Sequence, residues 1–199
     1  MRLVIATLLG LALGPALGGC DRQKAPAPQG DPGSSPGQAA GNAAAAAAYP
    51  TGRLDRSRAG TPAPETIFED PYGRPARIAD FRGRPVLVNL WATWCGPCIV
   101  EMPSLDALAA REGEALQVLA LSEDLDGRQK VTDFFAARGF VRLEPYLDPE
   151  LGFMTSLGVD TLPTTILYDA DGIEVWRMTG MADWGSERAA RLLTEAEAG

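Results

Sequence analysis

The 199 residues, 46% of them hydrophobic, suit one domain plus an extension, and the net charge of −8 divides into +3 over residues 1–60 and −11 over residues 61–199. An acidic domain without basic clusters gains little from releasing phosphate counterions, which disfavours nucleic-acid binding. The absence of histidine excludes Cys–His nucleophile pairs, His-ligated zinc or copper, and haem attachment at a CxxCH motif.

The beginning of the chain has the pattern of an export signal. Arg2 precedes the apolar stretch LVIATLLGLALGPALGG, which Gly10, Gly14 and Pro15 interrupt. A short basic region followed by such a stretch is typical of a signal peptide, whereas a transmembrane helix needs about 20 unbroken apolar residues. We therefore predict a signal peptide over residues 1–19 and export of the remaining chain.

The end of this stretch, LGGC at residues 17–20, resembles the lipobox of bacterial lipoproteins. In such signals, cleavage leaves the cysteine as the new N-terminus, and the cysteine carries the lipid. The resemblance implies lipidation at Cys20, and Asp21 resembles the signal for retention at the inner membrane in Gram-negative lipoproteins. Several acyl chains would make that anchor stable. The alternative is a spare thiol in a discarded or disordered segment.

Residues 20–60 are predicted to form the lipidated N-terminus and a disordered linker. From Asp21 to about Gly60 the chain consists mainly of small and polar residues, with almost no large apolar side chains. Such a segment buries too little surface to offset the entropy lost on ordering. The folded domain is therefore expected over residues 61–199.

The first half of this domain has the signals of a strand followed by a helix. A short lead-in hairpin is expected around Pro71-Tyr72-Gly73. The run VLVNLW, residues 86–91, is almost continuously apolar, which is typical of a strand buried on both faces. Apolar residues then recur at helical spacing over residues 96–112.

The second half adds strands and three further helices. We predict a buried strand over residues 116–121 and helices over residues 128–138 and 150–157. The turn sequence DADG joins two strands, residues 164–168 and 173–178. Ser186 is expected to cap a last helix. This order of elements predicts an α/β sandwich with a mixed sheet.

Two of the three cysteines lie where the strand over residues 86–91 gives way to the helix. Cys95 is placed at the helix N-terminus, where unpaired N–H groups and the helix dipole lower a thiol pKa from ~8.5 toward ~7. Pro97 falls in the first turn, where its missing N–H costs nothing. Cys98 is near enough for a disulfide. The spacing predicts an exposed, attacking thiol at Cys95 and a shielded, resolving thiol at Cys98.

Structural cysteines, or half of a zinc site, are the alternatives. Zinc needs two further ligands, and residues 61–199 contain no other cysteine and no histidine. Export would bring the pair into an oxidising compartment, where the two thiols form a disulfide unless something reduces them. The residues favour a redox function, and no metal ion or other cofactor is expected.

The stretch VLVNLWATWCGPCIVEMPSLDAL, residues 86–108, resembles the TlpA-like (ResA/CcmG-type) thiol–disulfide oxidoreductases of the thioredoxin family. Further markers are GVDTLPTT at residues 158–165, the DADG turn and ADW at residues 182–184. The resemblance runs from about Thr61 to the C-terminus. It implies a thioredoxin-like three-layer α/β sandwich with a mixed central sheet.

The resemblance also implies which residues contact the client protein. Pro163 matches the cis-proline that faces the two cysteines in this family. Leu162, just before it, would offer its backbone to an extended client segment, as in strand addition. Trp94 would wall the rim of the site, and Gly96 and Pro97 would complete the contact surface.

A glutamate matches the family pattern one helical turn beyond the second cysteine. By this resemblance Glu101 would take up the proton when Cys98 attacks the mixed disulfide. Its alternative role is that of a solvated charge on the helix. Thioredoxin carries a buried acid in the strand before its cysteines, and this chain has Asn89 at the matching place. We therefore expect Glu101, or water, to replace that acid.

The expected function is that of a membrane-tethered periplasmic reductase. Glycine and proline between the cysteines match the reducing thioredoxins, and no histidine is present there to make the site strongly oxidising. A membrane electron donor of the DsbD/CcdA type would recharge it. By resemblance its clients are exported proteins with reducible disulfides, such as apocytochromes c or copper-site proteins of terminal oxidases.

Two alternatives remain open at this point. One is a non-catalytic lipoprotein that binds Cu(I) through the two thiolates, since the soft ion suits sulfur ligands. The other is a thiol peroxidase of the peroxiredoxin type, which would need a lone activated cysteine before the helix. The CxxC arrangement supplies a neighbouring cysteine instead.

Overall fold

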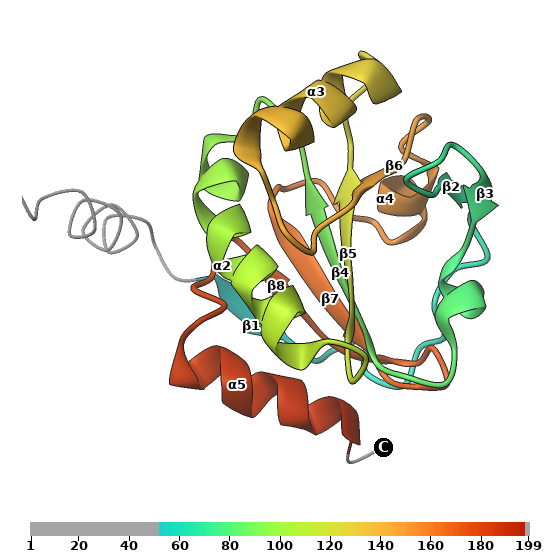
Figure 1. Cartoon of the computed structure of the whole chain (residues 1–199). Coiled ribbons are helices and arrows are strands. Elements are labelled where there is room, and N and C mark those ends of the chain that lie inside the picture. The colour runs from blue at the N-terminus through green and yellow to red at the C-terminus, as the bar shows by residue number, and fades with distance from the viewer. Residues whose placement is uncertain (1–51, 198–199) are drawn as a thin grey trace, which may run out of the picture. The chain divides into compact units, whose positions relative to one another are not determined.

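The structure is a computed structural model that describes residues 52–197 (Figure 1). The predicted signal peptide, Cys20 and most of the predicted linker lie outside the described residues. Across residues 52–197, none of the helices is both long and apolar enough to span a bilayer.

A mixed sheet of eight strands forms the centre of the described part. Across the sheet the strands are β1 (Arg53–Asp55), β8 (Glu174–Thr179), β7 (Thr164–Tyr168), β4 (Val86–Trp91), β5 (Gln117–Ser122), β6 (Pro145–Leu147), β2 (Phe68–Glu69) and β3 (Pro75–Ala76). The central strand β4 is parallel to β5 and antiparallel to β7. All of its side chains are buried, as its apolar run predicts.

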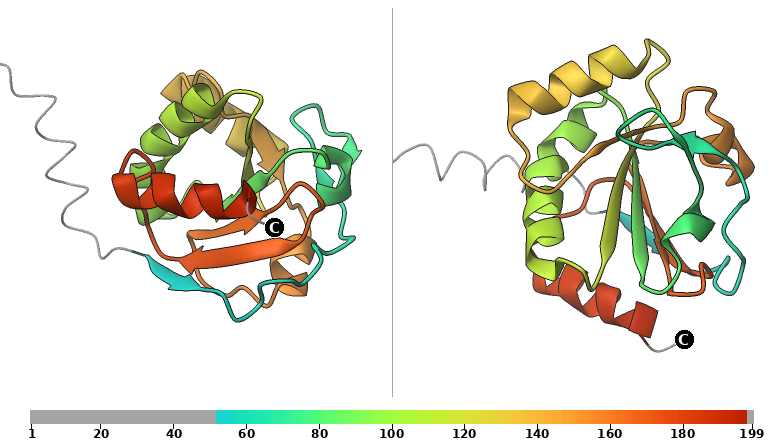
Figure 2. Two further views of the ribbon diagram at one scale, coloured as in Figure 1. Left: turned by 90° about the horizontal axis from the view of Figure 1, so that it is seen from below. Right: turned by 45° about the vertical axis from the view of Figure 1, so that its right-hand side comes forward.

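Helical elements lie on both faces of this sheet (Figure 2). They are α2 (Gly96–Glu112), α3 (Arg128–Arg138), α4 (Gly152–Ser156), α5 (Glu187–Leu193) and the 3₁₀ turns Ile78–Phe81 and Thr194–Glu197. Alternate side chains of β4 and β5 enter two separate cores, because successive residues of a strand point to opposite faces. Leu87 and Val118 pack on the side of α2, while Val88 and Leu119 pack on the side of α4.

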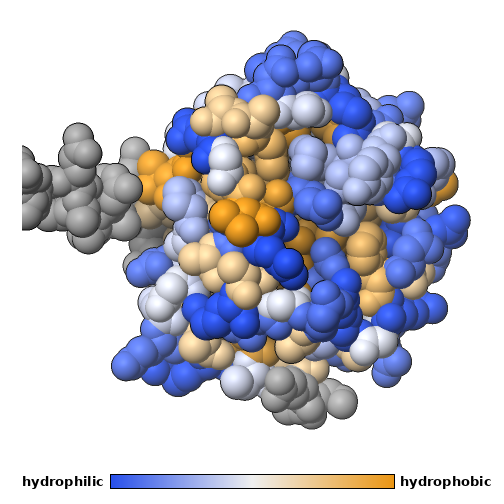
Figure 3. Space-filling view, in the orientation of Figure 1, coloured by the Kyte–Doolittle hydropathy of each residue, from blue (hydrophilic) through white to orange (hydrophobic). Residues whose placement is uncertain are grey.

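The outer layer formed by α2 and α3 is mostly hydrophilic at its surface, with small apolar patches over α2 (Figure 3). The buried positions of α2 include Met102, Leu105 and Leu108, which repeat at helical spacing. The helix therefore follows the predicted pattern of one apolar face toward the sheet. Together the two faces and the sheet make the three-layer α/β sandwich that the sequence predicts.

The beginning of the domain differs from the prediction. Residues 53–55, which we assigned to the linker, form β1 and pair antiparallel with β8, with Arg53 opposite Thr179 and Asp55 opposite Arg177. Backbone hydrogen bonds continue this contact, from Gly60 N–H to the carbonyl of Glu174 at 2.8 Å. The folded part thus begins before residue 61. A three-residue edge strand is too short for an apolar pattern, so its pairing with β8 decides its structure.

The predicted helix over residues 150–157 is shorter than expected. Leu151 has a φ of 54°, in the left-handed region, so the regular turns of α4 begin only at Gly152. The carboxylate of Asp148 accepts hydrogen bonds from the N–H groups of Gly152, Phe153 and Met154, which have no acceptors within the helix. This aspartate therefore fixes where α4 starts.

Candidate active site

Both cysteines of the CxxC motif lie at the N-terminus of α2, directly after β4. The N–H of Cys95 donates to the carbonyl of Ala92 at 3.0 Å, which closes the bend between strand and helix. Cys95 is the N-cap residue, and its sulfur accepts a hydrogen bond from the N–H of Cys98 at 3.4 Å. Pro97 lies in the first turn. The predicted position at the positive end of the helix dipole is confirmed.

Cys95 and Cys98 form a disulfide with an S–S distance of 2.03 Å and a Cα–Cα distance of 5.3 Å. Cys98 is fully buried, and Cys95 is 6% exposed. Cys95 is therefore less exposed than the thiol that we predicted. Cys95 is still the more exposed residue of the pair, which is the order that an attacking and a resolving cysteine require.

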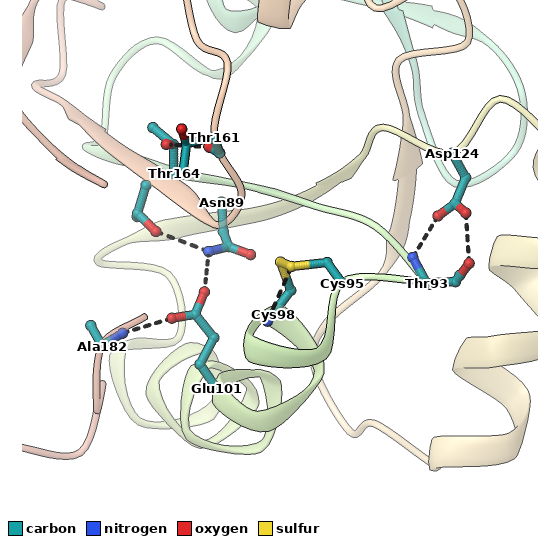
Figure 4. The surroundings of a disulfide bond; sticks show 10 residues. Asn89, Thr93, Cys95, Cys98, Glu101, Asp124, Thr161, Thr164 and Ala182 are labelled. Carbon is teal, nitrogen blue, oxygen red and sulfur yellow. Dashed lines mark hydrogen bonds between the residues drawn. A yellow bond between two sulfur atoms is a disulfide. The ribbon is translucent and has the colours of Figure 1, made fainter. Parts of the chain in front are cut away.

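Glu101 lies one turn along α2 from Cys98 and is 2% exposed. Its Oε1 accepts a hydrogen bond from Nδ2 of Asn89 at 2.7 Å, and its Oε2 accepts one from the N–H of Ala182 at 2.8 Å (Figure 4). Burial raises the pKa of Glu101 to about 7, although these hydrogen bonds act in the opposite direction. The alternative role as a solvated helix charge is therefore wrong.

Asn89 lies in the middle of β4 and is fully buried. Its Nδ2 donates a second hydrogen bond, besides the one to Glu101, to the hydroxyl of Thr165 on β7 at 2.9 Å. Figure 4 shows Asn89 and Glu101 together on one side of the disulfide. Thioredoxin has a carboxyl group at this position of the strand. The present chain instead has the amide of Asn89, which donates a hydrogen bond to the carboxyl of Glu101 on α2.

A second buried acid fixes the bend that precedes Cys95. Asp124 follows β5, and its carboxylate accepts hydrogen bonds from the N–H of Thr93 at 2.8 Å and from its hydroxyl at 2.6 Å (Figure 4). Burial acts to raise the pKa of Asp124, but the hydrogen bonds from Thr93 and Ser122 and the charge of Lys130 outweigh it and hold that pKa below its usual value. This contact joins residues 31 positions apart, so no local sequence pattern predicts it.

Glu123, next to it, is a buried acid without an obvious partner. Its N–H donates to the carbonyl of Trp91 at 2.8 Å, but over residues 52–197 neither carboxyl oxygen accepts a hydrogen bond. Burial, followed by the charge of Asp148, raises the pKa of Glu123 to about 9. The carboxyl of Glu123 is therefore protonated and uncharged at neutral pH.

The loop before β7 lies at the same end of the sheet as the cysteines, because Thr164 pairs with Leu90 near the end of β4. The Leu162–Pro163 peptide bond is cis, as the resemblance implies. The carbonyl of Pro163 accepts a hydrogen bond from the N–H of Gly180 at 2.8 Å. Among the described residues, the N–H and C=O of Leu162 make no hydrogen bond to another backbone group.

The remaining rim residues lie around Cys95 in sequence and in space. Trp94 is 66% exposed, Gly96 is exposed, and Pro97 is half-buried. These exposures are those that we expect of rim residues next to Cys95. Across residues 52–197, no group of three or more His, Cys, Asp or Glu side chains has the geometry to hold a metal ion.

Comparison with known proteins agrees with this geometry. Over 115 residues the chain is 34% identical to the thiol-disulfide oxidoreductase ResA of Geobacillus thermodenitrificans, covering 57% of this chain and 64% of the relative. The chain thus spans just under two thirds of that relative's length.

Solved structures share the fold. A structure from Chlorobium tepidum assigned as a thiol:disulfide interchange protein DsbE has a TM-score of 0.61 at 24% identity, covering 69% of this chain and 96% of that one. The lipoprotein thioredoxin Etrx1 of Streptococcus pneumoniae has a TM-score of 0.56 at 24% identity, covering 66% and 98%. These likenesses confirm the predicted thioredoxin-like fold.

The family model described as Redoxin matches residues 58–193, which include both cysteines, Glu101 and the cis-proline loop. This match covers more than half of the chain, and the named relative supports the predicted resemblance to ResA-type proteins. The chain therefore belongs to the Redoxin family.

Proposed function

We propose that the protein is a thiol:disulfide oxidoreductase that reduces disulfides in exported proteins. One observation carries the proposal: the sulfur of Cys95 caps α2 and is bonded to Cys98, and Cys95 is the more exposed residue of the two. A helix N-terminus stabilises the thiolate form of such a cysteine. The reduced protein would therefore present a reactive thiolate with a second thiol three residues away.

In the proposed reaction the Cys95 thiolate attacks one sulfur of a client disulfide. A Cys95–client disulfide forms, and the other client sulfur leaves as a thiolate that takes up a proton. Cys98 then loses its proton and attacks the sulfur of Cys95, which releases the second client thiolate. The client gains two electrons and two protons, and the protein ends in the Cys95–Cys98 disulfide of this structure.

Glu101 is the proposed acceptor of the proton that Cys98 loses. Its carboxyl lies one helical turn from Cys98, and Asn89 and Ala182 hold it in place. A pKa of about 7 matches a group that takes up and gives back a proton near neutral pH. Leu162 and Pro163, with Trp94 at the rim, would hold the client strand across the two sulfurs.

The sequence supports the location and the partners that we propose. The export signal and the lipobox support a periplasmic protein anchored to the inner membrane through lipid on Cys20. Because the product is a disulfide, each cycle needs a dithiol donor, which we propose to be a membrane protein of the DsbD/CcdA type. The family resemblance supports apocytochromes c or copper-site proteins as clients.

Trapping the client tests the proposal. In the Cys98→Ser variant the second attack cannot occur, so a mixed disulfide between Cys95 and the client should accumulate in a periplasmic extract and disappear on adding a small dithiol. The double variant that also carries Cys95→Ser is the control and should trap nothing. If the single variant traps no partner, or if purified reduced protein fails to reduce insulin, the proposal is wrong.

The direction of electron flow and the two alternative functions are tested by separate experiments. The Gly96-Pro97 pair supports a reducing site, and a redox potential close to that of the strong oxidant DsbA would contradict that direction. Tight Cu(I) binding without insulin reduction would favour the copper-binding alternative. Turnover of hydrogen peroxide that survives Cys98→Ser would favour the peroxidase.

A further inference from the structure

The loop that carries Leu162 and Pro163 is held at its start by two arginines from other parts of the chain. Leu157 is the C-cap residue of α4, and its carbonyl oxygen accepts hydrogen bonds from Arg58 Nη1 at 2.6 Å and from Arg177 Nη1 at 3.1 Å. The last carbonyls of a helix have no partners within it. Charged donors make the stronger class of hydrogen bond, so the two guanidinium groups satisfy this carbonyl well.

The two arginines differ in what else they do. Arg177 is buried and forms two hydrogen bonds of 2.7 Å to the carboxylate of Glu174, so the domain needs it for its own stability. Arg58 is exposed and comes from the segment that follows β1. That segment is fixed to β8 through Gly60 and Thr61, whose backbones bond to the carbonyl and the N–H of Glu174. Arg58 therefore reaches Leu157 from a firmly held backbone.

The chain from Leu157 to the client-binding position is short and well defined. Gly158 has a φ of 63°, and the N–H groups of Gly158 and Val159 donate to the carbonyls of Thr155 and Met154. This is the Schellman arrangement that ends a helix and turns the chain away from its axis. Five residues separate Leu157 from Pro163, and the carbonyl of Pro163 is held by Gly180. The direction in which the loop leaves Leu157 therefore sets where Leu162 lies.

We propose that Arg58 is a positioning residue for client binding, because its guanidinium group fixes the start of the 158–162 loop that presents the backbone of Leu162. This inference rests on the proposed function and assigns a role in it to the segment between β1 and the lead-in hairpin. The Arg58 side chain does not touch the sulfur atoms. Its effect should appear in the affinity for an extended protein substrate and not in the reactivity of Cys95.

The test compares Arg58→Ala and Arg58→Lys with Arg56→Ala in the full chain. Arg56 is a matched control because it lies two residues away and pairs instead with Glu195, at 2.6 Å. Each variant is assayed with insulin, a protein disulfide, and with glutathione disulfide, which offers no extended segment of comparable length. We expect Arg58→Ala to raise the KM for insulin about three- to tenfold, the effect of losing one charge-assisted hydrogen bond.

The same variant should leave the rate with glutathione disulfide within about twofold of the wild type, since it does not touch the reacting atoms. Arg58→Lys should restore part of the insulin KM, and Arg56→Ala should leave both substrates unchanged. Equal losses with both substrates, or an unchanged insulin KM in Arg58→Ala, would overturn the positioning role. Insulin reduction by the wild type tests the proposed function by itself, so the two failures can be distinguished.

Discussion

Asn89 on the central strand donates a hydrogen bond to the buried carboxyl of Glu101 on α2, with 2.7 Å between the two side-chain atoms. The strand residue and the helix residue are 12 positions apart. We predict that Glu101 takes over the role of the buried acid that thioredoxin carries at the position of Asn89. Moving the carboxyl to the helix places it on the same element as Cys98. The amide keeps the carboxyl in place without adding a second negative charge.

Replacing this carboxyl should slow one step of the cycle. In Glu101→Gln we expect attack by Cys98 on the mixed disulfide to slow by about a hundredfold, the usual contribution of a general base. The glutamine keeps an acceptor for the N–H of Ala182, so the fold should survive. Single-turnover kinetics with a preformed mixed disulfide measure the step. Glu112→Gln, near the other end of α2, is the control and should resolve at the wild-type rate.

The pH dependence of the same step identifies the group. The carboxylate form is the base, and the pKa of Glu101 is about 7, so the wild-type rate should rise as pH passes from 6 to 8. Glu101→Gln should lack that rise. An equal rise in both proteins would show that another group, or water, accepts the proton.

The position of Cys95 predicts an acidic thiol in the reduced protein. With a helix N-terminus beneath it and the N–H of Cys98 directed at its sulfur, the pKa of Cys95 should fall from ~8.5 toward ~7. The rate of alkylation by iodoacetamide, measured against pH in Cys98→Ser, reports this value without interference from the second thiol. A midpoint at the value of an ordinary cysteine would contradict the proposed exchange chemistry.

The contact between Asp124 and Thr93 should stabilise the bend before Cys95. Asp124→Asn weakens the acceptor for the N–H and hydroxyl of Thr93, and we expect a loss of about 1–3 kcal/mol in the free energy of unfolding at pH 7. Because the pKa of Asp124 is lowered in the folded state, its contribution is present above pH 3.8 and is lost as pH falls through the lowered value. The stability difference between wild type and variant should therefore shrink in acid.

Urea unfolding of the oxidised protein measures this difference. Asp126→Asn is a suitable control, because Asp126 is exposed and its pair with Lys130 is a surface contact of little energetic weight. A variant at position 124 that unfolds like the control would show that the bend does not depend on this carboxylate.

Local patterns in the sequence were enough to predict most of the elements and the position of the two cysteines. A run of apolar residues gives β4, helical spacing gives α2, and the order strand–CxxC–helix places Cys95 at the helix N-terminus. The strand β1 was missed because three residues at a sheet edge carry no pattern of their own. Their structure comes from pairing with β8, more than a hundred residues later in the chain.

The supporting contacts of the site could not be predicted for the same reason. The carboxyl of Glu101 accepts hydrogen bonds from Asn89 and Ala182. The carbonyl of Leu157 accepts one from Arg58, which lies 99 residues earlier in the chain. Each of these pairs depends on how the layers pack, which no local propensity specifies. The family resemblance named Glu101, but its partners became visible only in the folded chain.

The proton on the buried carboxyl of Glu123 should make the oxidised protein less stable in alkali. The pKa of Glu123 is raised to about 9, so the folded state keeps a proton that the unfolded chain releases above about pH 4.5, and stability falls as pH rises between these values. Glu123→Gln keeps a neutral donor toward Asp148 and should lose less stability between pH 6 and pH 9, by on the order of 1–3 kcal/mol. Urea unfolding of the oxidised form at both pH values avoids titration of the thiols, and Glu150→Gln, at an exposed position nearby, should follow the wild type. If Glu123→Gln loses as much stability as the wild type over this range, Glu123 is not protonated in the folded state. In that case another group must compensate its buried charge.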